Sequence, residues 1–165
     1  IQQYEARNNQ GQSSTWIRPN HYPQPDLMIT QIESCLTGQQ PELFLELKIT
    51  LQSQSLHKPS HLAIDITDSS GTAIMQAIPT ADNYLHHHAA PHSVKIQIDL
   101  PSLIPGQYLI SVWAGSHNLE TIDWVREVVK FEVHESPILG RTFPHSPDHG
   151  YIVPHSTVAY QPAQI

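Results

Sequence analysis

The sequence predicts an all-β protein: an antiparallel β-sandwich of about seven or eight strands with an immunoglobulin-like or jelly-roll-like topology. In residues 94–100, four aliphatic side chains alternate with Lys95, Gln97 and Asp99, which is the period of a strand with one buried and one solvated face. Two more alternating runs follow, in residues 108–113 and 129–133, and turn-forming Pro, Gly and polar residues separate the three runs. Three such strands in close succession are typical of half an antiparallel sandwich.

The earlier part of the chain supplies the other strands. Residues 1–25 are polar and rich in Pro, without periodicity, and are predicted to form a linker and an extended lead-in. Residues 26–165 are predicted to form the sandwich domain. Its first strand is expected at residues 27–36, followed by the most regular alternation of the sequence at residues 43–51.

A hairpin is predicted next. Residues 62–67 and 72–78 alternate on either side of Asp68-Ser69-Ser70-Gly71, a tight-turn signal. The final strand is expected at residues 151–160, where Pro154 would confine it to an edge or a bulge.

Composition and charge limit the classes of partner. The net charge is −7, from 15 acidic residues against eight scattered Lys and Arg, so no basic stripe for a nucleic-acid backbone is expected. Cys35 is the only cysteine, which excludes an internal disulfide. No apolar run reaches the roughly 20 residues of a membrane-spanning helix. We therefore expect a soluble domain without a nucleic-acid partner, and the composition leaves a neutral, hydroxyl-rich ligand open.

Several segments together resemble one known family. They are the strand and turn LPSLIPGQYLISVW (residues 100–113), the polar loop with Asp123, the strand VVKFEV (residues 128–133), and the glycines Gly140 and Gly150 before the last predicted strand. This pattern is similar to the carbohydrate-binding C-terminal domain of Wzt proteins, the ATP-binding subunits of bacterial ABC transporters that export O-antigen polysaccharide. The hairpin turn at Asp68 is similar to one in the earlier half of that family.

The resemblance implies both a function and an assembly. It implies a β-sandwich that follows an ATPase domain and binds polysaccharide or lipid-linked O-antigen at the cytoplasmic side of the inner membrane. No P-loop motif occurs in the 165 residues, so the ATPase would be a separate domain. That domain, and through it the membrane subunit of the transporter, would be the partners. The resemblance also implies a homodimer that pairs through the last strand, with contacts from Tyr151, Ile152, Val153, Val158 and Tyr160.

Sugar recognition requires flat apolar faces together with side-chain amides or carboxylates for the hydroxyl groups. If Tyr108, Ile110 and Val112 point inward, Trp113 points to solvent, and Trp124 follows the next loop. A sugar platform could be assembled on one sheet from outward-facing side chains, for which the candidates are Trp113, Trp124, Phe44, Glu46, Asp65 and Gln97.

Other chemistries have weaker signals. Neither the run His86–His88 nor the pair His145 and His149 has the spacing of a recognised metal site, so no metal and no cofactor are expected. The sequence contains no GxSxG or HExxH motif. Glu46 and Asp65 could form a glycosidase pair only if the fold joined them. A non-catalytic carbohydrate-binding domain is the main hypothesis, and a structural or oligomerisation module without a ligand is the alternative.

Overall fold

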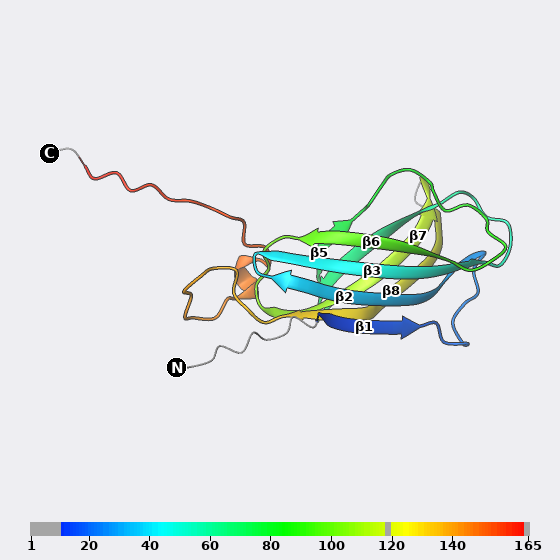
Figure 1. Ribbon diagram of the computed structural model, residues 1–165, viewed down its shortest axis with the longest axis horizontal. Coiled ribbons are helices and arrows are strands. Elements are labelled where there is room, and N and C mark those ends of the chain that lie inside the picture. Colours follow the sequence, from blue (N-terminus) through cyan, green and yellow to red (C-terminus); the bar gives the residue numbers. More distant parts are fainter. Residues whose placement is uncertain (1–10, 118–119, 164–165) are drawn as a thin grey trace, which may run out of the picture.

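Two four-stranded antiparallel sheets face each other in the computed structural model, which describes residues 11–117 and 120–163 (Figure 1). One sheet has the order β1-β2-β3-β6 and the other β5-β4-β7-β8. The predicted all-β antiparallel sandwich is confirmed. The strands are β1 (Gln12–Ile17), β2 (Leu27–Gln39), β3 (Glu42–Ser53), β4 (His61–Asp68), β5 (Ala73–Ala77), β6 (His92–Leu100), β7 (Gly106–Ser116) and β8 (Glu120–Val133).

The core lies between the two sheets and follows the alternation of the sequence. The five aliphatic side chains at the odd positions 43–51 of β3 are all buried, and so are Tyr108, Ile110 and Val112 of β7. Tyr108 stacks on Phe131 with ring centroids 5.2 Å apart and donates its hydroxyl to the Ile104 carbonyl at 2.7 Å. Burial raises the pKa of Tyr108 to about 12, so this hydroxyl stays a donor.

The start of the described chain differs from the expectation. Residues 12–17, predicted to belong to the linker and lead-in, form β1, which pairs antiparallel with β2 at the edge of its sheet. The side chains of Ser14 and Trp16 are half-buried, whereas those of Ser13, Thr15 and Ile17 are exposed. An edge strand buries so little that its sequence can be almost entirely polar, which is why its composition suggested a linker. Residues 1–10 lie outside the described residues.

The end of the chain also differs. The strand predicted at residues 151–160 is wrong: only a single bridge forms, between Leu103 and Ile152, with backbone hydrogen bonds on either side of it. Pro154 follows directly, and its ring nitrogen has no hydrogen to donate. Residues 154–163 then run away from the sandwich, drawn in red in Figure 1.

Helical structure is minor in the part of the chain that the structure describes. The short 3₁₀ helix η2 (Pro147–His149) lies in the segment between β8 and Tyr151. Within residues 11–117 and 120–163, no helix has the length and apolarity needed to cross a membrane.

Candidate carbohydrate-binding site

Two tryptophans lie side by side on the outer face of the β5-β4-β7-β8 sheet. Trp113 of β7 and Trp124 of β8 are direct cross-strand partners, so their side chains leave the same face. Ala63 of β4, which is buried, is the partner of Trp113 on the other side. Trp124 is 46% exposed and Trp113 is half-buried. The outward orientation predicted for Trp113 is confirmed.

The Trp113 ring lies against the sheet because residue 115 is glycine. A Cβ atom on Gly115 would lie only 2.2 Å from Cζ2 of Trp113 and 2.4 Å from its Cη2, so the six-membered ring occupies the place of the missing side chain. Trp113 Nε1 donates a hydrogen bond to Thr121 Oγ1 at 2.8 Å. The His61 ring packs against the indole at an interplanar angle of 61°, with the ring centroids 5.4 Å apart. The indole is therefore held in position before any ligand arrives.

A bulge in β8 shapes the surface around Trp124. The register between β7 and β8 shifts at Ser111, where Glu127 adopts a left-handed backbone conformation with φ of 53°. The Glu127 N–H donates to Ser111 Oγ at 2.8 Å, which gives the bulge a fixed partner. The Arg126 guanidinium lies over the Trp124 ring, 4.5 Å from its centroid. In the described part of the chain, Arg126 forms no ion pair with an acidic side chain.

Two open hollows flank these tryptophans. The first, of about 430 Å³, lies in front of Trp113, and the second, of about 440 Å³, lies in front of Trp124. Asp65 of β4 and Gln76 of β5 line both hollows. These two residues are cross-strand partners, and Gln76 Nε2 donates to Asp65 Oδ1 at 2.8 Å. The surface thus combines aromatic faces with a carboxylate and an amide, the groups that sugar recognition uses.

The six residues predicted for one sugar platform are divided between the two sheets. Trp113, Trp124 and Asp65 share the face just described. Phe44, Glu46 and Gln97 lie on β3 and β6 of the other sheet, where Glu46 and Gln97 are cross-strand partners. Sequence alternation assigns each side chain to the inside or the outside, but it does not assign a strand to a sheet. A glycosidase pair of Glu46 and Asp65 would also need both carboxylates on one surface, whereas their strands belong to different sheets.

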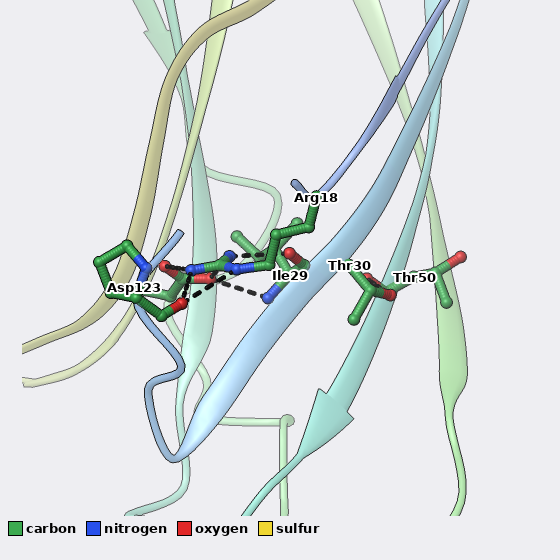
Figure 2. A network of polar contacts seen from close by, with 6 residues as sticks. Arg18, Ile29, Thr30, Thr50 and Asp123 are labelled. Carbon is green, nitrogen blue, oxygen red and sulfur yellow. Dashed lines mark hydrogen bonds and ion pairs between the residues drawn. The ribbon is translucent and has the colours of Figure 1, made fainter. Parts of the chain in front are cut away.

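Sequence reasoning missed a buried ion pair directly behind this surface. Arg18, which follows β1, contacts Asp123 of β8 with an Nη1–Oδ2 distance of 2.8 Å, and both side chains are at least 93% buried. Asp123 Oδ2 also accepts the Ile29 N–H at 2.8 Å. Figure 2 shows this network between the sheets. Asp123 therefore fixes β8 to the opposite sheet immediately before Trp124. The sequence did contain a signal for this buried acid. Asp123 stands two residues before the inward-facing Val125, and alternation therefore places its carboxylate on the inner face of the strand.

The predicted dimer-contact residues fall into two groups. Tyr151, Ile152 and Val153 lie against the body of the domain, where Ile104 N donates to Tyr151 O at 2.9 Å and Val153 N to Ser102 O at 2.9 Å. Val158 and Tyr160 are 94% and 88% exposed.

Tyr151 attaches this segment to the β4–β5 turn. Its hydroxyl donates to the Asp68 carboxylate, which also accepts the Ser70 N–H at 2.9 Å and the Thr72 N–H at 2.8 Å. The hydrogen bond from Tyr151 is the largest of the effects that hold the pKa of Asp68 well below its usual range. The same bond raises the pKa of Tyr151. Asp68 thus stabilises the turn and the end of the domain at once.

Most of the histidines in the part that the structure describes lie in loops, and they form no metal centre there. His86, His87 and His88 are all exposed, and His145 Nε2 contacts Ser136 Oγ at 2.7 Å. Among residues 11–117 and 120–163, no three His, Cys, Asp or Glu side chains are arranged to hold a metal ion.

Comparisons with known proteins agree with this fold. The model of the Wzt C-terminal domain family matches residues 37–152, which include β3 to β8 and both tryptophans of the site. Among solved structures, the chain is similar to one described as the crystal structure of the C-terminal domain of Wzt. The TM-score is 0.64 at 14% sequence identity, and the match covers 92% of this chain and 91% of the other. No curated protein matches the sequence.

Proposed function

Because the chain belongs to the Wzt C-terminal domain family, we propose that it is a non-catalytic domain that binds O-antigen polysaccharide for export by an ABC transporter. The family supports the general role of a carbohydrate-binding domain in such a transporter. The outer face of the β5-β4-β7-β8 sheet is the proposed binding surface, with Trp113, Trp124 and Asp65 as its contacts.

The observation that carries this proposal is the position of the Trp113 ring. The half-buried Trp113 lines an open hollow of about 430 Å³, and the C–H side of a pyranose packs on the face of an aromatic ring in such a place. Hydrogen bonds to the sugar hydroxyls are available from Asp65, from Gln76 and from His61, all of which line the same hollow. Since Thr121 and His61 already hold the ring, little side-chain entropy is lost on binding.

The exposed tail supports a homodimer as the functional unit. Val158 and Tyr160 project two large apolar side chains into solvent, and a second copy of the domain would cover them. Two linked sites raise the apparent affinity for a polymer without any new contact. Millimolar to micromolar affinity per site, about 4 to 8 kcal/mol, is then sufficient. We further propose a location at the cytoplasmic side of the inner membrane, with the membrane subunit reached through an ATPase domain.

Titration of the 165-residue chain with purified O-polysaccharide of the source bacterium tests this function. Calorimetry is expected to give saturable binding that is lost in the Trp113→Ala variant. Phe44→Ala is the matched control, because it removes an aromatic ring from the outer face of the opposite sheet. If neither the polysaccharide nor its fragments bind at millimolar sugar, the alternative of a structural or oligomerisation module without a ligand is correct.

A further inference from the structure

The two hollows on the outer face of the β5-β4-β7-β8 sheet adjoin each other at two shared residues, and the pair of hollows is called the trough. Each contains one tryptophan, and the hydrogen-bonded pair of Asp65 and Gln76 lines both hollows. Trp113 and Trp124 are opposite each other on neighbouring strands, where Cβ atoms are roughly 4.5–5.5 Å apart. Two stacking faces at this spacing, with polar groups shared between them, do not match a ligand of a single ring.

We infer that this trough binds a segment of at least two consecutive sugar residues, one packed on Trp113 and the next beside Trp124. The inference rests on the proposed function and specifies its ligand: an oligosaccharide segment and not a single sugar. The chain of sugars would run along β4, from the hollow lined by His61 to the hollow lined by Thr67. It would pass Asp65 and Gln76, whose free lone pairs and N–H groups bind the hydroxyls of both sugars.

The two halves of the trough differ in rigidity and chemistry. The Trp113 half is fixed by Gly115, Thr121 and His61. The Trp124 half is more exposed and carries the Arg126 guanidinium on its ring. We therefore assign the Trp113 half as the site that binds one sugar by itself. The Trp124 half adds affinity only when a second sugar is linked to the first.

Fragments of defined length test this inference. The O-polysaccharide of the source bacterium is partially hydrolysed and sized into fragments of one, two and four residues, and each is titrated into the intact chain by calorimetry or NMR. The disaccharide is expected to bind at least about tenfold more tightly than the monosaccharide, a gain of about 1.4 kcal/mol. Four residues should add little more, because the trough has two stacking faces.

Variants separate the two halves of the trough. Trp124→Ala is expected to lose the gain from the second sugar, so that it binds the disaccharide no more tightly than the monosaccharide, and Trp113→Ala should lose binding of both. Phe44→Ala on the other sheet should retain the full dependence on length. Equal affinities for one and two residues, or an unchanged length dependence in Trp124→Ala, would overturn the inference while the proposed function stands. A failure of the polysaccharide and all its fragments to bind would instead overturn the proposed function, and this inference with it.

Discussion

Arg18 and Asp123 form a buried ion pair that joins the two sheets of the sandwich. The guanidinium also donates to the carbonyls of Ile29 and Pro23, at 2.9 and 2.6 Å, and Asp123 accepts the Ile29 N–H. Every strong donor and acceptor of the pair therefore has a partner, which is the condition under which burial of two charges is tolerated. Since Asp123 directly precedes Trp124, the network also positions the outer surface of β8.

Replacement of one member of this pair should destabilise the fold strongly. Arg18→Met leaves the Asp123 carboxylate buried without its counter-charge, and we expect a loss of about 3–5 kcal/mol in the free energy of unfolding. Urea denaturation followed by tryptophan fluorescence measures it. Lys58→Met is the matched control, because it breaks the exposed pair with Glu120 and should cost at most about 1 kcal/mol. Equal losses in the two variants would contradict the structural role of the buried pair.

The hydrogen bond between Tyr151 and Asp68 should make stability depend on acid pH. The pKa of Asp68 is lowered in the folded state, whereas in the unfolded chain it returns to about 3.9. Below that pH the unfolded state binds the additional proton, so the stabilisation is fully present above about pH 4 and is lost as the pH falls.

Tyr151→Phe removes the hydroxyl and should let the pKa of Asp68 rise towards its usual value. We expect the variant to be less stable than the wild type at neutral pH, with a difference that narrows as the pH falls below about 4. Denaturant titrations at several pH values measure this. Tyr160→Phe, which changes an exposed tyrosine, should behave as the wild type. A gap between Tyr151→Phe and the wild type that is the same at all pH values would mean that Asp68 does not act through Tyr151.

Thr121→Val should weaken glycan binding without unfolding the domain. Valine keeps the shape of threonine but cannot accept the hydrogen bond from Trp113 Nε1. A neutral hydrogen bond contributes about 0.5–1.5 kcal/mol, so we expect the dissociation constant for O-polysaccharide to rise by roughly two- to tenfold. Calorimetry gives this value and thermal melting checks the fold. Unchanged affinity would show that the indole needs no support from Thr121.

Removal of residues 154–165 should convert the proposed dimer into a monomer. The truncation spares the backbone hydrogen bond from Val153 to Ser102, and Val158 and Tyr160 make little contact with their own domain. We therefore expect the melting temperature of the monomer to change little at low protein concentration. Sedimentation equilibrium measures the mass. A dimer that survives the truncation would exclude the tail as its contact.

Sequence alternation predicted most of the fold because inward aliphatic residues recur at every second position through most of β3, β4, β6 and β7. It did not find β1, whose exposed and polar side chains carry no such pattern. It placed a strand at residues 151–160, where tyrosine and valine suggested one but no neighbouring strand pairs with the segment beyond Ile152. For the candidate site, Trp113, Trp124 and Asp65 were predicted to face outward. Phe44, Glu46 and Gln97 lie on the other sheet. Their sheet could not be predicted, because alternation within a strand does not show which other strands it pairs with.

The indole N–H signals of the three tryptophans give the most direct test of glycan binding on the β5-β4-β7-β8 sheet. In a two-dimensional ¹H–¹⁵N NMR titration with O-polysaccharide, we expect the signals of Trp113 and Trp124 to shift with one saturation curve. Trp16, which packs against Tyr22 on the other sheet, should not move and is the internal control. Shifts confined to Trp16, or no shift of Trp113 at saturating polysaccharide, would contradict the proposed binding surface.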